Sequence, residues 1–373
     1  MSTSFQELAG RVALPRGIDV CRIGIGCWPI GGPDSNLGMP MGWSTADDTE
    51  ARRGLDRAYE LGANLFDTAD VYGHGHSERL VGWLLSHVPR NQVAVASKVG
   101  YFAGTAPHAY DPRHMRRQLE QTLDNLGTDY IDIYSLHNAN FGPDDRYLAG
   151  AIESMREFQQ RGLIRAIGMR GPHRFAPERL SNVRSRADKH ARFRTLFDVM
   201  RPDVLAVRYN LLTPETRYGG IMDFAAEHGV LVMINKPLGQ GLLTGSYIPA
   251  SPPDFGTGDH RARKRWFTQP ALSVLHEQLS PLRERFGIES GKIVRVALRY
   301  CLQRSEHSVV LVGFTTCAQI EANLTELGSP LTDDDLRVVS EVGRRAQREL
   351  DALGEVFIDE VDREPDARPA GGR

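Results

Sequence analysis

Residues 51–85 read ARRGLDRAYELGANLFDTADVYGHGHSERLVGWLL, in which a helical pattern ends at Gly62 and a short apolar run, ANLFDTA (63–69), follows it. Short apolar runs bounded by turn signals are typical of buried strands. A glycine directly after a helical pattern is a common helix stop, because glycine adopts the left-handed conformation without strain. The segment therefore predicts one helix-to-strand step of an alternating α/β fold.

The same alternation continues along the chain. Further helical patterns cover residues 111–127 and 147–162, and each ends at a glycine. Eight apolar runs are predicted as strands: RIGIGC (22–27), ANLFDTA (63–69), QVAVASKV (92–99), YIDIYSLH (130–137), IRAIGMR (164–170), VLAVRYN (204–210), VLVMINK (230–236) and VVLVGF (309–314). Eight parallel βα units close into a (β/α)8 TIM barrel. We therefore expect one α/β domain over residues 1–355, with this barrel as its core.

Other segments add to the barrel. VALPRGIDVC (12–21) predicts a short hairpin around Pro15-Arg16-Gly17 ahead of the first strand. Residues 246–269, the covering segment, are too rich in Pro and Gly to begin as a helix and too long for a simple connection. Residues 332–353 predict a final helix, and the polar residues 356–373 predict a disordered tail.

Four chemically different side chains fall at or just after the ends of the predicted strands. Asp67 and Tyr72 lie in FDTADVYG, Lys98 lies in ASKVG, and His137 lies in YSLHNA. The carboxyl ends of barrel strands meet at one face, where such folds hold their active sites. We therefore expect an acid, a phenol, an amine and an imidazole in one pocket.

These four groups suit the reduction of a carbonyl by hydride. The developing alkoxide needs a proton, and a phenol can supply it if its pKa, near 10 when unperturbed, is lowered. Lys98 beside Tyr72 is expected to lower that pKa, while Asp67 holds Lys98 protonated and in place. His137 is expected to donate or relay a hydrogen bond to the carbonyl oxygen.

Residues 51–85 resemble the first signature of the aldo-keto reductase family, whose catalytic tetrad maps onto Asp67, Tyr72, Lys98 and His137. Further matches follow in the family's order: IGIGCWPIGG (23–32), DYIDIYSLHNA (129–139), KPLGQGLLTG (236–245) and VLVGFTTCAQIEANL (310–324). The resemblance implies a carbonyl reductase or alcohol dehydrogenase on a (β/α)8 barrel. It also implies that the N-terminal hairpin plugs the barrel bottom, that the C-terminal helix packs outside, and that the covering segment folds over a nucleotide.

The cofactor implied by the resemblance is an extended nicotinamide dinucleotide, NADP or NAD, across the barrel mouth. No GxGxxG motif follows a strand, so a Rossmann site is not expected. By resemblance, seventeen residues contribute to the cofactor site: Gly26, Cys27, Trp28, Asp67, Arg170, Pro237, Leu238, Gly239, Gln240, Gly241, Leu242, Gly313, Phe314, Thr315, Gln319, Glu321 and Asn323.

The chain departs from the family pattern where the nicotinamide carboxamide is held. Residues 168–171 read Gly-Met-Arg-Gly in place of Gly-Val-Ser-Asn, Ala206 replaces a glutamine, and Asn235 replaces a stacking aromatic. Three missing hydrogen bonds of about 1 kcal/mol each correspond to about two orders of magnitude in affinity. Arg170 can donate to the carboxamide oxygen but cannot accept from its amide. We expect Arg170 to point into the barrel mouth and to support an anionic group on the substrate or the cofactor.

The choice between the two dinucleotides depends on a contact to the 2′-phosphate. Thr316 and Gln319 stand at positions that are often basic in family members selecting this phosphate, and neither can supply a charge-assisted contact of about 1.5–3 kcal/mol. Lys264 or Arg265 in the covering segment is the available substitute. We therefore expect weak discrimination between NADP and NAD.

Aromatic side chains are expected to line the substrate pocket, namely Trp28, Trp43, Tyr101 and Phe102. His74 and His76 suggest a metal pair, but no third ligand follows at a suitable spacing, so no metal site is expected.

Composition limits the class of partner. A chain of 373 residues that is 41% hydrophobic can bury a large core, and its formal net charge of −2 provides no field for nucleic acid or an anionic membrane. The four cysteines show no CxxC spacing and are expected to be free thiols of a reducing compartment. No apolar run has the length of a signal-peptide core or a membrane span. We expect a cytoplasmic protein that acts on a small molecule.

Two other functions are compatible with the same residues. A barrel that keeps the tetrad can transfer protons without a redox cofactor, as in dehydration or epimerisation, and the lost carboxamide contacts favour this alternative. A non-catalytic regulatory barrel, similar to the potassium-channel β subunits of the same superfamily, is the third, and those subunits also keep their tetrad. The reductase is the leading hypothesis.

Overall fold

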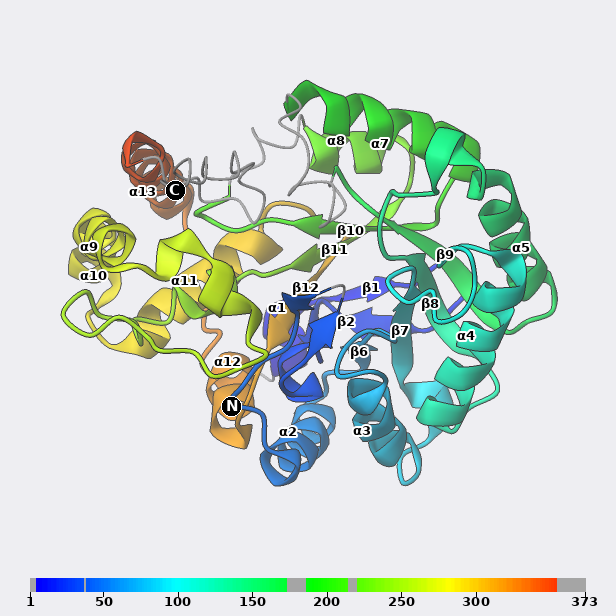
Figure 1. Cartoon of the computed structure of the whole chain (residues 1–373). Helices are drawn as coiled ribbons and strands as arrows, with labels where there is room; N and C mark the ends of the chain where they lie inside the picture. Colours follow the sequence, from blue (N-terminus) through cyan, green and yellow to red (C-terminus); the bar gives the residue numbers. More distant parts are fainter. Residues whose placement is uncertain (1–4, 37, 173–185, 214–219, 354–373) are drawn as a thin grey trace, which may run out of the picture.

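A closed barrel of eight parallel strands forms the core of the computed structural model, which describes residues 5–36, 38–172, 186–213 and 220–353. Helices surround this barrel (Figure 1). The strands follow one another around it in chain order: β3 (Ile23–Gly26), β6 (Leu65–Asp67), β7 (Ala94–Val99), β8 (Ile131–Leu136), β9 (Ile164–Arg170), β10 (Val204–Arg208), β11 (Leu231–Asn235) and β12 (Ser308–Gly313). All eight predicted strands and the (β/α)8 class are confirmed.

The helices cover the outside of the barrel: α2 (Asp48–Glu60), α3 (His76–Leu85), α4 (Pro112–Leu126), α5 (Leu148–Gln160), α7 (Arg186–Met200), α8 (Ile221–Glu227), α11 (Ser290–Leu302) and α12 (Cys317–Thr325). Helix α4 shows how local sequence sets the bounds. Asp111 accepts hydrogen bonds from the backbone N–H groups of Arg113 and His114, and Gly127 ends the helix at φ 61°. Within the described ranges, no helix is both long and apolar enough to cross a membrane.

The expected hairpin consists of β1 (Arg11–Ala13) and β2 (Asp19–Cys21), paired antiparallel. Leu14 and Val20 belong to the same apolar cluster as inward-facing barrel residues such as Leu65 and Ile133. The hairpin therefore closes the bottom of the barrel, as predicted.

Further helices and strands lie in the loops of the barrel or outside its ring of helices (Figure 1). They are α1 (Phe5–Ala9), the two-residue strands β4 (Ser35–Asn36) and β5 (Met39–Pro40), and the helices α9 (Gln269–Gln278), α10 (Ser280–Phe286) and α13 (Asp333–Ala352). Helix α13 packs against α9 and α10 outside the barrel, as expected for the final helix. The predicted tail at 356–373 lies outside the described residues.

Polar side chains complete the hydrogen bonding at the amino ends of several strands. Three backbone N–H groups each donate to such a side chain at 2.9 Å: Cys21 to Asn64, Val95 to Asp132 and Ile167 to Asp203. A buried backbone donor left without an acceptor is costly, so these side chains stabilise the barrel where the strand ladder ends.

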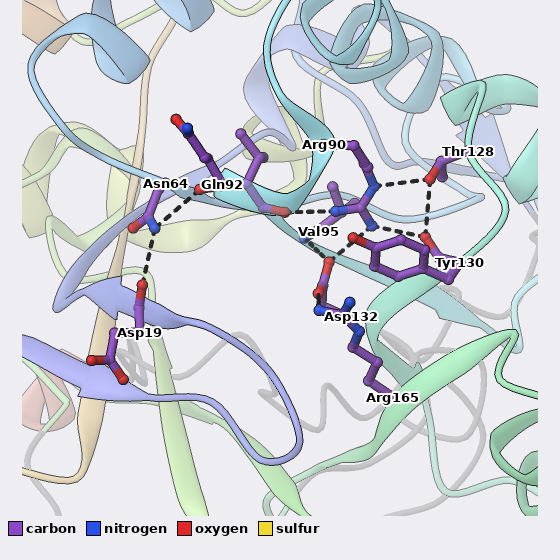
Figure 2. Close-up of polar contacts among 10 residues, drawn as sticks. Asp19, Asn64, Arg90, Gln92, Val95, Thr128, Tyr130, Asp132 and Arg165 are labelled. Atoms are coloured by element: carbon purple, nitrogen blue, oxygen red, sulfur yellow. Dashed lines mark hydrogen bonds and ion pairs between the residues drawn. The ribbon is translucent and has the colours of Figure 1, made fainter.

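Asp132 lies at the centre of a cluster of polar and charged groups (Figure 2). Its carboxylate accepts from Arg90 and from Arg165, each at 2.9 Å, and its side chain is 1% exposed. Both guanidinium groups also lie over the ring of Tyr130, at 3.9 and 4.2 Å from its centroid. Two cations and a backbone donor therefore share one buried carboxylate, far from the carboxyl ends of the strands.

Replacing Asp132 with Asn should lower the free energy of unfolding by about 1.5–3 kcal/mol, because two charge-assisted hydrogen bonds lose their anion. Urea unfolding followed by circular dichroism measures this change. The control is Arg116→Ala, which removes an exposed ion pair with Glu157 and should cost about 1 kcal/mol or less. Equal effects of the two substitutions would show that the Asp132 cluster contributes no more than a surface pair.

Candidate active site

The four side chains predicted to act together line one cavity of about 590 Å³ at the carboxyl end of the barrel. Asp67 is the last residue of β6, Lys98 lies in β7, and His137 directly follows β8. Tyr72 lies in the loop between β6 and α3, and it faces the same cavity. The strand order β6–β7–β8 places these residues on adjacent strands, which is why their spacing in the sequence brings them together.

Lys98 and Asp67 form a buried ion pair, and each residue is 6% exposed. The Lys98 Nζ lies 2.9 Å from both Asp67 carboxylate oxygens and donates to the carbonyl oxygen of Thr68 at 2.5 Å. Burial lowers the pKa of Lys98, but the charges of Asp67 and Tyr72 outweigh it, so the net pKa is raised. Lys98 is therefore held as an ammonium ion.

Tyr72 lies against this ion pair, with the Lys98 Nζ 4.9 Å from the centroid of its ring. Burial raises the pKa of the Tyr72 hydroxyl, Lys98 opposes this effect, and Asp67 reinforces it, so the net direction is upward. The expectation that the Tyr72 pKa lies below its usual value is therefore wrong in its net direction, because burial raises this pKa by more than the charge of Lys98 lowers it. The ammonium still acts in the expected sense.

His137 and the aromatic residues form the walls next to Tyr72. The His137 ring meets Tyr72 edge to face at 5.9 Å and Tyr101 at 4.8 Å between ring centroids. On the other side, Trp28 stacks on Tyr72 at 5.8 Å. Trp28, Trp43 and Tyr101 line the cavity as expected, whereas Phe102 stacks on His74 outside it.

Gly31 and Gly73 allow the loop of Tyr72 to approach the entrance loop, residues 28–47. Gly73 has φ 60°, and a Cβ there would lie 2.0 Å from the carbonyl oxygen of Gly31. Any side chain at Gly73 would therefore push the two loops apart and displace Tyr72.

The two histidines near Tyr72 have separate partners. The Nε2 of His74 lies 2.7 Å from Asp34, and the Nε2 of His76 lies 3.0 Å from Asp48. Within the described ranges, no three potential ligands gather in a way that could hold a metal ion. These contacts connect the segment after Tyr72 to the entrance loop and to α2.

Most residues expected at the cofactor site line the cavity: Gly26, Trp28, Asp67, Arg170, Pro237, Leu238, Gln240, Gly241, Gly313, Phe314, Thr315, Gln319 and Asn323. Four do not line it. Cys27 is fully buried and Leu242 packs in the apolar core, while Gly239 is buried beside the cavity. Glu321 turns to the surface, where it accepts from Arg57 at 2.9 Å.

Several lining residues were missed in the sequence. Arg208 ends β10, Lys236 directly follows β11, and Arg295 lies on α11, where it donates to the carbonyl oxygen of Ser329. Arg208 could have been predicted from the sequence. It stands two residues after Ala206, which was expected at the cavity, and alternate residues of a strand share a face. Lys236, with φ 58°, is the last residue of the predicted strand 230–236 and directly follows β11 in the structure.

The covering segment reaches across the barrel mouth to the entrance loop. Asp259, which is fully buried, accepts from the backbone N–H of Ser44 at 2.9 Å and from its hydroxyl at 3.0 Å. Arg261 donates to both oxygens of Asp259, at 2.9 and 2.7 Å. The Arg261 guanidinium also lies 3.9 Å from the centroid of Trp43. Two segments far apart in the chain therefore close over the cavity.

His260 connects this closure to the catalytic residues. Its fully buried ring lies 4.2 Å from Trp28 and 5.1 Å from Trp43 between centroids. Burial lowers the pKa of His260 well below its usual range, and the charges of Lys264 and Lys236 act in the same direction, so the ring is neutral. Because Trp28 stacks on Tyr72, the covering segment has a direct packing route to the reaction centre.

Asp259→Asn should weaken this closure. Burial alone would raise the pKa of Asp259, but hydrogen bonds from Arg261 and Ser44 lower it to about 2, below its unfolded value of about 3.9. A depressed carboxyl pKa adds stability above the unfolded pKa that is lost as the pH falls towards 2. We expect Asp259→Asn to lower the unfolding free energy by about 2 kcal/mol at pH 7.

Urea unfolding of both proteins at pH 7 and at pH 3 tests the Asp259 prediction, since the difference should shrink in acid. Asp254→Asn, at an exposed site of the same segment, is the matched control. A difference that is the same at both pH values would contradict the assignment.

The residues of the cavity fit a nicotinamide dinucleotide. The cavity extends from the tetrad to Gln319 and Asn323 of α12, and Gly26 and Gly313 present flat backbone on the paired strands β3 and β12. Lys236, Arg261 and Arg295 provide positive charge along its length. At the catalytic end, Ala206 and Arg170 stand side by side on paired strands, so the family's carboxamide contacts are absent there.

The comparisons with known proteins agree with this geometry. The model of the Aldo/keto reductase family matches residues 22–344. The NADH-specific methylglyoxal reductase of Escherichia coli (strain K12) is 29% identical over 349 residues, covering 89% of this chain and 97% of that protein. The L-galactose dehydrogenase of Arabidopsis thaliana is 28% identical over 321 residues, covering 84% and 87%.

Solved structures give the same result. The glycerol dehydrogenase from Gluconobacter oxydans superposes with a TM-score of 0.69 at 25% identity, covering 91% of this chain and 96% of that one. The holo form of an aldo-keto reductase from Bacillus halodurans superposes with a TM-score of 0.64, also at 25% identity, covering 90% and 96%. With a family match over most of its length, the chain belongs to the aldo-keto reductase family.

Proposed function

We propose that this oxidoreductase is a carbonyl reductase or alcohol dehydrogenase in which Tyr72 exchanges the proton and NAD(P) exchanges the hydride. One observation carries the proposal. Tyr72, His137 and the buried pair of Lys98 with Asp67 face a single cavity that also has the length and charge to hold a dinucleotide.

The arrangement assigns a task to each residue. A substrate carbonyl placed between Tyr72 and His137 has its oxygen within reach of the phenol hydroxyl and the imidazole. The bound dihydronicotinamide supplies the hydride. Tyr72 donates its proton to the oxygen as negative charge develops there, and Lys98 stabilises the phenolate that remains. Asp67 keeps Lys98 charged and oriented.

We propose small oxygenated carbonyls and alcohols as the substrate class. Methylglyoxal, L-galactose and glycerol appear in the names of the similar proteins, and all are small and polar. The cavity of about 590 Å³ must hold both the dinucleotide and the substrate, which leaves little volume for a large substrate.

Titration of the purified protein with NADH, NADPH and their oxidised forms, followed by fluorescence, tests the proposal. The reduced forms should bind, and the complex should then turn over methylglyoxal or another small aldehyde. A protein that binds none of the four dinucleotides would refute the proposed redox function. The similar proteins named above are reductases and dehydrogenases, so the cofactor-independent and regulatory alternatives are not favoured.

Discrimination between NADH and NADPH should be below about a hundredfold in kcat/KM. Gln319 already accepts from the backbone of Thr315 at 2.8 Å, and Arg261 is paired with Asp259. Neither therefore offers a free charge-assisted contact of about 1.5–3 kcal/mol to a 2′-phosphate. Lys264 and Arg265 of the covering segment are the expected substitutes. A preference for NADPH above a hundredfold that survives replacement of both Lys264 and Arg265 by Ala would contradict this prediction.

A further inference from the structure

The charge next to Tyr72 is largely cancelled within the tetrad itself. Lys98 is bound to both oxygens of Asp67, so this ion pair has no net charge. The two members act on the Tyr72 hydroxyl in opposite directions, since Lys98 lowers its pKa and Asp67 raises it. An ion pair of this kind stabilises a nearby phenolate less than an isolated ammonium would.

Arg170 brings a further positive charge to the same place. It is the last residue of β9 and lines the cavity together with Tyr72 and His137. The pairing of Leu136 with Met169 between β8 and β9 places the following residues, His137 and Arg170, side by side. Arg170 therefore stands next to the histidine at the carbonyl end of the cavity.

The neighbours of Arg170 leave room for its long side chain. On the other side of β9, Arg170 pairs in register with Ala206, whose side chain is a single methyl group. Ala206, which stands where the family has a glutamine, thus also opens the space in which a guanidinium can reach the centre of the barrel mouth.

The charge of Arg170 acts on the catalytic residues across this space. It lowers the pKa of Asp67, after the larger effects of burial and Lys98, and it lowers the pKa of Tyr72 in the same sense as Lys98. The charged and titratable groups that share the cavity or the loop with Tyr72 include Asp67, Lys98, Tyr101, His137, Arg170, Arg208, Lys236 beyond Trp28, and Asp70 and His74 on its own loop.

Besides Lys98, Arg170 is the cation among these groups whose charge lowers the pKa of Tyr72. The Lys98 Nζ lies 2.9 Å from both oxygens of Asp67, and burial raises the pKa of Asp70 well above its usual range. Arginine remains protonated throughout the accessible pH range.

We propose that Arg170 is a second cation of the catalytic centre, which acts with Lys98 to stabilise the oxygen anion left when Tyr72 gives up its proton. The proposal rests on the proposed function and adds a positioning residue that acts through Tyr72. In reduction, the carbonyl carbon gains the hydride and its π electron pair moves to the oxygen. That oxygen takes the proton of Tyr72, and the phenolate left behind later regains a proton from solvent. Oxidation of the alcohol runs the same steps in reverse, with the phenolate as base.

The decisive measurement is a titration of the Tyr72 phenol in the protein without substrate. The ultraviolet difference absorbance of phenolate is recorded against pH, and subtraction of the matching Tyr72→Phe protein isolates this residue. Arg170→Gln should raise the midpoint by about one pH unit, a tenfold higher proton affinity, because one unit charge at several ångströms has this effect at a partly solvated site. Arg170→Lys should retain most of the wild-type midpoint, since it keeps the charge.

A matched control comes from the far end of the cavity. Arg295→Gln removes an arginine charge from α11, where Arg295 donates to the carbonyl oxygen of Ser329, and should leave the midpoint unchanged. The pH profile of kcat for alcohol oxidation supplies a second reading, in which the pKa of the base should rise by the same amount in Arg170→Gln. A protein misfolded by the substitution would instead lose its near-ultraviolet circular dichroism.

Two results separate the inference from the proposed function. If Arg170→Gln leaves the Tyr72 midpoint unchanged and only weakens dinucleotide binding, Arg170 is a cofactor contact and the inference is overturned. If the midpoint shifts as expected while the wild-type protein binds no dinucleotide, the electrostatic inference stands and the redox function fails.

Discussion

Tyr72→Phe is expected to reduce turnover of a carbonyl substrate by about 10²–10⁴-fold, the range associated with removing a general acid. The phenyl ring keeps the packing of Tyr72 against Trp28 and His137 but carries no proton. Dinucleotide affinity should stay nearly unchanged, because only the transition state needs the hydroxyl. Steady-state kinetics and a fluorescence titration on the same preparation measure the two quantities.

The matched control for this substitution is Tyr101→Phe, which removes another phenol hydroxyl from the same cavity. Tyr101 packs on His137, whereas Tyr72 is the tyrosine over whose ring the Lys98 ammonium lies, so loss of the Tyr101 hydroxyl should have a much smaller effect on kcat. Wild-type rates in the Tyr72→Phe protein would show that the proton comes from elsewhere, and the assignment of the tetrad would be wrong.

The barrel was predictable because two features of the sequence indicate the same alternation of strands and helices. Each strand is a short apolar run, and helical patterns long enough to return the chain to the starting edge of the sheet separate several of these runs. A strand buried on both faces must be apolar, as Val95 and Ile133 are, both at 0% exposure. The same regularity allowed Asp67 and His137 to be placed, since the carboxyl ends of all barrel strands lie at the same face of the barrel.

The closure over the cavity was not predictable in detail. Ser44 and Asp259 are separated by 215 positions in the chain, and no local pattern indicates that they pair. The covering segment was recognised from its length and composition alone. These exclude a helix at its start and a simple connection, but they do not indicate which residues it contacts. Its hydrogen bonds with Ser44 and Arg261 depend on side-chain directions that periodicity does not encode.

Resemblance to a family assigns positions but not orientations. Cys27 and Glu321 were expected at the cofactor site because they lie in matching motifs; the Cys27 side chain lies in the core and Glu321 binds Arg57 on the surface, and their part in cofactor binding stays a prediction. Asp132 was seen only as part of a strand, although it holds two arginines at the other end of the barrel. The predicted direction of the Tyr72 pKa shift was wrong for a related reason. The proximity of Tyr72 to Lys98 can be inferred from the sequence, but the extent to which Tyr72 is buried cannot.

Lys98→Met is expected to remove both activity and stability. Without the ammonium, Asp67 is left as a buried carboxylate beside Tyr72, and the charge of Asp67 and the burial of Tyr72 itself both oppose formation of the phenolate. Removing one partner of a buried ion pair costs about 3–5 kcal/mol of unfolding free energy. The raised pKa of Lys98 means that the pair stabilises the fold below the unfolded pKa of about 10.4 and that this contribution is lost as the pH rises further.

The double variant Asp67→Asn with Lys98→Met separates the two roles of this ion pair. It removes the stranded carboxylate, so most of the stability lost in Lys98→Met should return, because neutral residues of similar size carry no unpaired buried charge. Turnover should not return, since no cation of the pair remains to stabilise the Tyr72 phenolate. A double-mutant cycle measures both roles: urea unfolding and kcat are determined at pH 7 for the wild type, Asp67→Asn, Lys98→Met and the double variant. If the double variant regained turnover together with stability, Lys98 would serve the fold alone, and the phenolate would depend on another cation, for which Arg170 is the residue in place.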